Sequence, residues 1–164
     1  MKKLILALAC IAALASCVKK EDKDPIDVSK TTFVMNGKWQ LKVYTWLPDI
    51  TDPTSTPVDI YTPLPGCRKD NFYIFNTKTR VSLYDNLSKC AITDPDSTVY
   101  GYTLTNDDKY LTIFTNPDDA NHENVLAGDI TYPSIDTFVV TYLGINPQDT
   151  TKTSRYTEKY AKIQ

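Results

Sequence analysis

The chain has 164 residues, a mass of 18.5 kDa, a formal net charge of -2, and a hydrophobic fraction of 41%. This composition excludes an intrinsically disordered chain and a polytopic membrane protein, and the small acidic surplus argues against a nucleic-acid partner. One histidine and five glycines leave little material for a metal centre or a phosphate-binding loop, so we expect no cofactor.

The first sixteen residues have the pattern of an export signal. Lys2 and Lys3 precede an apolar run over residues 4–15, which is too short to cross a bilayer. The run ends in Leu14-Ala15-Ser16-Cys17, which resembles the bacterial lipobox. That resemblance implies cleavage before Cys17, acylation of this residue with chains such as palmitate, and a mature lipoprotein tethered to the membrane. The alternative is ordinary secretory cleavage after Ser16, which leaves a free thiol.

Residues 17–32 are predicted to form the lipidated cysteine and a flexible tether. Lysine, glutamate and aspartate alternate there, Pro25 interrupts them, and aromatic residues are absent. Lys19-Lys20-Glu21-Asp22 resembles the signal that sends lipoproteins to the cell surface in some Gram-negative lineages, although a solvated linker explains it equally well. We therefore expect a lipid-anchored outer-membrane protein, on the periplasmic face or at the cell surface.

Residues 33–164 read as an all-β domain. All 18 aromatic residues lie there, and Trp39, Leu41 and Val43 alternate with polar residues as in a half-buried strand. Further strands are predicted over residues 71–76, 79–84, 98–104, 110–115, 137–143 and 155–163, and a weaker one over 58–61. Short polar turns at 76–78 and 106–108 favour sequential hairpins. The predicted fold is a single closed, up-and-down antiparallel β-barrel of about eight strands.

Two longer segments interrupt this meander. Residues 47–66 contain five prolines and should form a long, stiff loop after the first strand. Residues 116–133 form the second segment. Within it a short helix is predicted to be capped by Asn116, to begin at Pro117 and to end before Gly128.

Cys67 and Cys90 remain as a pair once Cys10 leaves with the signal and Cys17 carries lipid. They lie almost symmetrically about the turn at 76–79, so they should face one another at the far end of that hairpin in an oxidising compartment. We expect a disulfide, because a metal site would need more ligands. The only histidine, His122, lies in a polar loop without a nearby nucleophile, so no catalytic residue is assigned and an enzyme is not expected.

Three groups of residues resemble segments of lipocalin sequences. Gly37-Lys38-Trp39 resembles the Gly-x-Trp that opens the first lipocalin strand. The hairpin from Cys67 to Cys90 is similar to the lipocalin-like domain of small bacterial lipoproteins, through the run CRKDNFYIF from Cys67, then Val81, Leu83 and Lys89-Cys90. The strands with Gly101-Tyr102-Thr103-Leu104 and Leu111-Thr112-Ile113 continue the likeness. It implies a calyx whose closed end is sealed by Gly37 and Trp39, with Arg155 covering Trp39 and residues 47–66 over the mouth.

A small barrel either fills its interior or holds one small ligand. For a cavity, the predicted lining consists of Phe75, Leu83, Tyr102, Leu104, Phe138 and Tyr142. The leading hypothesis is a lipid-anchored protein that binds a small apolar or amphipathic ligand. One alternative is an interaction subunit with a filled barrel that docks onto another envelope protein. The other is a β-sandwich adhesin or carbohydrate-binding module.

Overall fold

The computed structural model describes residues 33–35 and 37–164. The predicted signal peptide, lipidated Cys17 and tether lie outside these residues. Within the described part of the chain, no helix is long and apolar enough to span a membrane.

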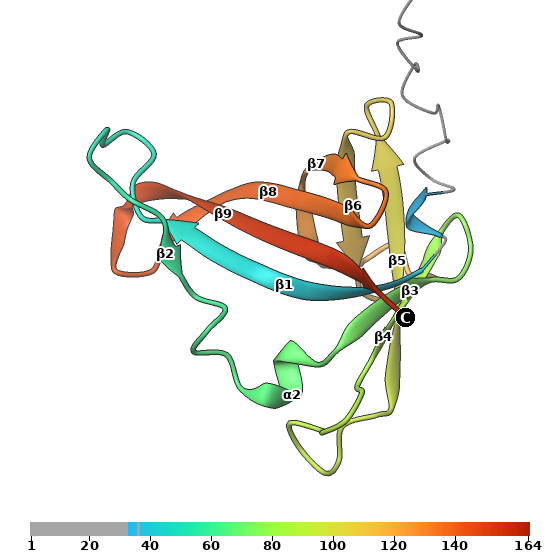
Figure 1. Ribbon diagram of the computed structural model, residues 1–164. Coiled ribbons are helices and arrows are strands. Elements are labelled where there is room, and N and C mark those ends of the chain that lie inside the picture. The colour runs from blue at the N-terminus through green and yellow to red at the C-terminus, as the bar shows by residue number, and fades with distance from the viewer. Residues whose placement is uncertain (1–32, 36) are drawn as a thin grey trace, which may run out of the picture.

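The described chain is almost entirely β-structure (Figure 1). A short helix, α2, spans Gly66–Lys69. The strands are β1 (Lys38–Leu47), β2 (Val58–Asp59), β3 (Phe72–Phe75), β4 (Arg80–Tyr84), β5 (Ser97–Thr105), β6 (Tyr110–Phe114), β7 (Asn124–Ser134), β8 (Thr137–Asn146) and β9 (Asp149–Ile163).

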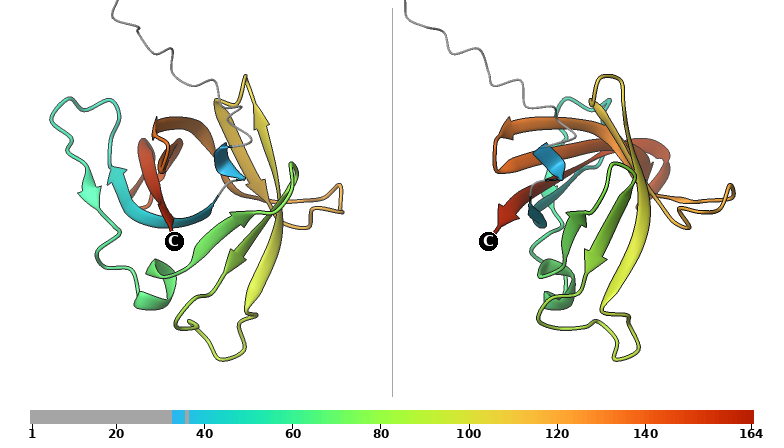
Figure 2. Two further views of the ribbon diagram at one scale, coloured as in Figure 1. Left: turned by 45° about the vertical axis from the view of Figure 1, so that its right-hand side comes forward. Right: turned by 90° about the vertical axis from the view of Figure 1, so that its right-hand side faces the viewer.

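The strands close into an antiparallel barrel, as the sequence predicts. From β3 to β9 each strand pairs with the next one along the chain, and β1 pairs with both β3 and β9. These eight strands form the ring, which Figure 2 shows from two sides. β2 is an additional strand that pairs with the end of β1 outside the ring.

The ring is uneven, and this unevenness creates its open mouth. β1 pairs with β9 from Lys38 to Leu47 but with β3 only from Lys38 to Gln40. Beyond Gln40, β1 and β3 separate, and the segment that carries α2 runs between them (Figure 1). β1, β8 and β9 continue together as a long ribbon on the other side.

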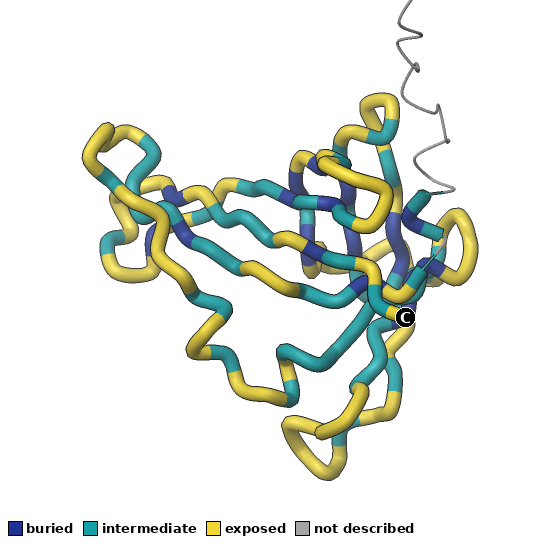
Figure 3. The backbone as a smooth tube through the Cα atoms, in the orientation of Figure 1, coloured by how far each residue is buried: buried dark blue, intermediate teal, exposed yellow. Residues whose placement is uncertain are grey.

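The opposite end of the barrel is closed by a packed aromatic core. Trp39 is fully buried, and its indole N–H donates to the carbonyl of Val34 at 2.7 Å. The Trp39 ring lies 5.1 Å from that of Phe33 and 5.0 Å from that of Phe138. Figure 3 shows most buried positions gathered at this end. Apolar burial there is the main stabilising contribution to the barrel.

Arg155 does not cover Trp39, so this prediction is wrong. β9 runs antiparallel to β1, which places Arg155 opposite Leu47 at the far end of the ribbon. The residue opposite Trp39 is Lys162, near the end of β9. The side chain of Lys162 also crosses Gly37 so closely that a Cβ there would lie 2.7 Å from it.

The helix predicted after Asn116 is also wrong. Residues 116–123 form a loop in which Asn116 has a φ of 46°, and β7 follows it. β7 is the ring strand that the sequence did not predict, whereas the weak strand predicted at 58–61 is β2, which lies outside the ring. Gly128 interrupts the pattern of β7 for a packing reason: a Cβ there would lie 2.5 Å from the main-chain oxygen of Thr141 on β8.

Candidate functional site

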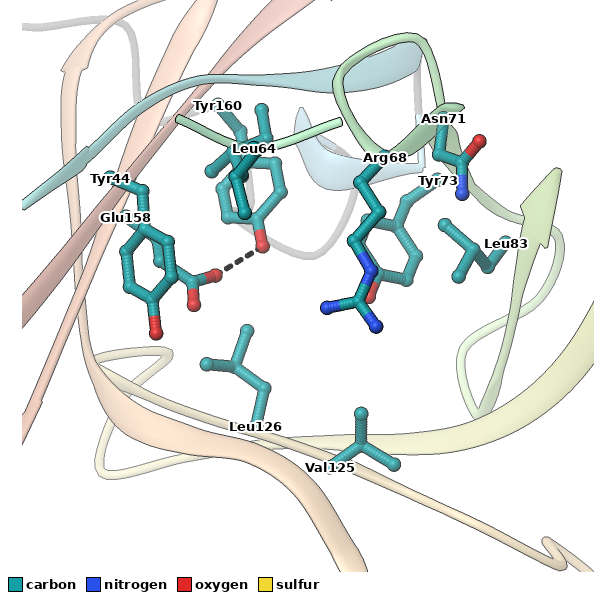
Figure 4. A pocket seen from close by; sticks show the side chains of 11 residues that line it. Tyr44, Leu64, Arg68, Asn71, Tyr73, Leu83, Val125, Leu126, Glu158 and Tyr160 are labelled. Atoms are coloured by element: carbon teal, nitrogen blue, oxygen red, sulfur yellow. Dashed lines mark hydrogen bonds between the residues drawn. The ribbon is translucent and has the colours of Figure 1, made fainter. Parts of the chain in front are cut away.

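A cavity of about 440 Å³ lies in the mouth of the barrel, on the side where β1 and β3 separate. Figure 4 shows it from close by. Strands β1, β3, β4, β7 and β9 and the segment around α2 supply its walls. The lining residues are Leu41, Tyr44, Leu64, Arg68, Asn71, Tyr73, Leu83, Val125, Leu126, Glu158 and Tyr160.

Much of the wall is aliphatic. Leu83 from β4 faces Leu126 and Val125 from β7 across the cavity, and Leu64 overlies them from the loop before α2 (Figure 4). Such a surface favours the apolar part of a ligand, because apolar area removed from water contributes about 25 cal/mol per Å².

Glu158 is the one acidic side chain in the lining, and tyrosines surround it. The Tyr142 hydroxyl donates to its Oε1 at 2.9 Å, and the Tyr160 hydroxyl donates to its Oε2. The hydroxyls of Tyr44 and Tyr142 lie 3.0 Å apart. Since the single proton of Tyr142 is used on Glu158, Tyr44 donates to Tyr142. The three strands β1, β8 and β9 thus share one hydrogen-bonded chain that ends on the carboxylate.

The tyrosine rings pack against one another and hold this chain in place. Tyr142 stacks on Tyr156 with ring centroids 5.3 Å apart, and Tyr44 lies 6.3 Å from Tyr156. Tyr73 from β3 meets Tyr160 edge to face at 5.9 Å. These contacts leave few alternative rotamers, so the polar wall is preorganised.

Burial controls the charge state of this cluster. Desolvation raises the pKa of Glu158 above its ordinary value, and hydrogen bonds from Tyr160 and Tyr142 partly oppose that rise. Desolvation and the nearby Glu158 charge raise the pKa values of Tyr142 and Tyr160. The tyrosines therefore remain neutral hydrogen-bond donors at physiological pH.

Arg68 and Tyr73 contribute polar groups from the other side of the mouth. Figure 4 shows the Arg68 side chain pointing into the cavity. Among the described residues, the Arg68 guanidinium has no ion pair and the Tyr73 hydroxyl has no hydrogen-bond partner. Both are available to a ligand. Asn71 lies beside them, and its Oδ1 is buried without a partner in the described part of the chain.

A disulfide and a hydrogen bond hold α2 at the rim of the cavity. The predicted disulfide is present: Cys67 on α2 is bonded to Cys90 in the loop after β4, with a Cα separation of 5.2 Å. Gln40 Nε2 on β1 donates to the carbonyl of Lys69 at 2.9 Å. Arg68 lies between these two attachments, so its main chain is fixed on both sides.

Of the six predicted lining residues, Leu83 lines the cavity. Phe75, Tyr102 and Phe138 are buried in the packed core, and Leu104 packs against it. Tyr142 faces the same interior but reaches the site through its bond to Glu158. All six side chains thus face the barrel interior, but the sequence did not show how far along the barrel each one lies.

Sequence reasoning missed Glu158, Arg68, Tyr44, Tyr73 and Tyr160 as site residues. A signal for Glu158 existed. Positions 154, 156, 158 and 160 share one face of β9, and Glu158 is the only charged residue among them. A glutamate between two tyrosines on an inward face is unusual enough to mark a site.

Within the described residues, no group of three or more histidine, cysteine, aspartate or glutamate side chains could hold a metal ion. His122 is exposed and packs against the Phe114 ring at 4.2 Å, away from the cavity lining. No protein-family model and no curated protein matches the chain. Its function is therefore inferred from the cavity and the side chains that line it.

Proposed function

We propose that the protein is a lipid-anchored, lipocalin-like protein of the bacterial outer membrane whose barrel binds a small amphipathic molecule. The observation that carries this proposal is the cavity of about 440 Å³, which combines aliphatic walls with Glu158, a set of tyrosines and Arg68. Ligand pockets typically occupy about 300–1,000 Å³ and pair apolar walls with a few convergent polar groups.

The aliphatic walls supply the affinity and the polar groups supply the orientation. A ligand that buries about 200 Å² of apolar surface gains about 5 kcal/mol from that burial, before the cost of association. The buried polar groups then select a ligand that can pair with them, because leaving them unpaired is costly.

The N-terminal end of the described domain lies where an anchored protein with an accessible cavity would need it. Phe33 packs against Trp39 and Tyr132 at the closed end of the barrel. An anchor that precedes Phe33 in the chain would therefore join the barrel at the end opposite the mouth. The lipobox-like Leu14-Ala15-Ser16-Cys17 supports such an anchor. Fractionation tests it: Cys17→Ser should move the protein from the membrane to the soluble fraction, and continued membrane association would contradict lipidation.

One observation favours a second candidate function. Leu87 and Ile92 in the loop after β4 are 86% and 95% exposed. Apolar loop tips of this kind suit docking onto another envelope protein. The third hypothesis was a β-sandwich adhesin or carbohydrate-binding module. The β-sandwich fold is excluded, because the sheet closes into a single barrel.

Native mass spectrometry of the oxidised protein, after exposure to an envelope extract from its own cells, tests ligand binding. The proposal predicts a reproducible added mass that is lost on denaturation. Leu83→Trp fills the cavity and should abolish the added mass, whereas Leu87→Trp at the exposed loop tip should retain it. A bare mass together with a recovered protein partner would instead favour the interaction subunit.

A further inference from the structure

We propose that the ligand carries an organic ammonium group, which binds against Glu158 while the apolar part of the ligand packs on the aliphatic wall. This inference rests on the proposed ligand-binding function and names the chemical class of the ligand. It follows from the charge, the rings and the hydrogen bonds of the cavity.

Glu158 is a largely enclosed carboxylate without a counter-ion among the described residues. No lysine or arginine nitrogen there lies within 4.0 Å of its carboxylate, and its two hydrogen bonds come from neutral hydroxyls. Removing a carboxylate from water is costly unless a positive charge is paired with it. Part of its surface faces the cavity (Figure 4), so a ligand can supply that charge.

The rings around Glu158 also favour a cation. Tyr44, Tyr73 and Tyr160 line the same cavity. The electron-rich face of a tyrosine attracts an ammonium group within about 6 Å of its centroid. In addition, the Tyr44 hydroxyl donates its proton to Tyr142, so its lone pairs are left to accept a hydrogen bond from an ammonium N–H.

Arg68 has the opposite charge to Glu158 and would favour an anionic ligand. Arg68 is an exposed residue, whereas burial removes the Glu158 carboxylate from most of its contact with water. Charges near solvent interact through a high dielectric and are screened by salt, while enclosed charges are screened much less. An anion that entered the cavity would also approach the Glu158 carboxylate. The enclosed carboxylate therefore sets the sign of the preferred ligand.

Binding of a cation should be coupled to the ionisation of Glu158. The ionisable groups that face it are Tyr44 on β1, Tyr142 on β8 and Tyr160 on β9, with Tyr73 on β3 and Arg68 on α2 across the cavity. The pKa values of the four tyrosines are raised by burial, so they stay neutral while Glu158 changes its charge. Below its raised pKa the carboxylate is protonated and the cation loses its partner.

Calorimetric titration of the full chain with three probes of equal chain length tests the inference: octylammonium, octanoate and octanol. We expect octylammonium to bind more tightly than the other two. Glu158→Gln, which keeps the shape of the side chain, should weaken octylammonium at least about tenfold and leave octanol unchanged. Asp107→Asn removes an exposed carboxylate outside the cavity lining, so it is the matched control and should leave octylammonium within about twofold.

The outcomes separate this inference from the proposed function. Preference for octanoate with loss in Arg68→Gln would overturn the ammonium assignment while leaving ligand binding intact. Octylammonium binding that is equal in Glu158→Gln would also overturn it. Failure of all three probes, octanol included, would overturn the proposed function itself. If Glu158→Gln does not fold, the wild type still decides, because octylammonium affinity must fall with pH below the Glu158 pKa while octanol affinity stays constant.

Discussion

Replacing the disulfide by Cys67→Ser and Cys90→Ser should lower the free energy of unfolding by about 3 kcal/mol. The bond joins residues 23 positions apart and closes a loop around the β3–β4 hairpin. In the chain-entropy description, a disulfide over such a loop lowers the conformational entropy of the unfolded chain. This raises the free energy of the unfolded state by about 3 kcal/mol. For a domain of this size, the corresponding fall in Tm is roughly 10 °C.

The folded state should change little, because other contacts hold the same segments. Gln40 Nε2 still reaches the carbonyl of Lys69 at 2.9 Å. The backbone amides of Leu87 and Ser88 each donate to Asp70 Oδ2 at 3.1 Å, which ties the loop after β4 to the end of α2. The loss is therefore expected mainly through the unfolded state.

Urea unfolding followed by tryptophan fluorescence measures the effect. Trp39 and Trp46 are both buried, so exposure to water shifts their emission. Wild type in a reductant is the matched control, and it should unfold at the same urea concentration as the double variant. A loss below about 1 kcal/mol would refute the entropy argument, since it would mean that local hydrogen bonds, not the cross-link, restrict this hairpin. Two titratable thiols in unreduced protein would refute the pairing itself.

Two further predictions concern packing and pH. Gly128→Ala places a methyl group against a main-chain oxygen of β8 at 2.5 Å, so it should lower the unfolding free energy by about 1–3 kcal/mol. Gly66→Ala meets nothing within 4 Å and should leave stability unchanged or slightly higher, and equal effects of the two substitutions in urea unfolding would contradict this packing. Burial raises the folded-state pKa of Glu158 above its ordinary value of 4.5, so the folded protein binds this proton more tightly than the unfolded chain. The resulting stability is fully present below the ordinary pKa and is lost as pH rises through the raised one, at about 1.4 kcal/mol per pKa unit. Urea unfolding measured as the pH rises above 4.5 should show this loss in the wild type and not in Glu158→Gln, and equal slopes would contradict the assignment.

The sequence by itself determined the class of fold, the sequential hairpins and the disulfide. These features depend on short-range patterns. Alternation places Phe75 and Tyr73 on one face of β3 and Phe138 and Tyr142 on one face of β8, wherever the strands finally pair. The turn residues at 106–108 each adopt a positive φ, between 52° and 61°, as asparagine and aspartate can.

Only the tertiary structure decided which inward side chains meet. The register of β9 on β1 sends Arg155 to the far end of the ribbon and brings Glu158 beside Tyr44. The close approach of β7 and β8 explains Gly128, which in the sequence had indicated the end of a helix. The cavity exists because β1 leaves β3 after Gln40, and the disulfide and Gln40 hold Arg68 at the rim of that opening. Pairing between strands far apart in the chain fixes all of these contacts, and the period-two pattern of a single strand carries no information about its partner's register.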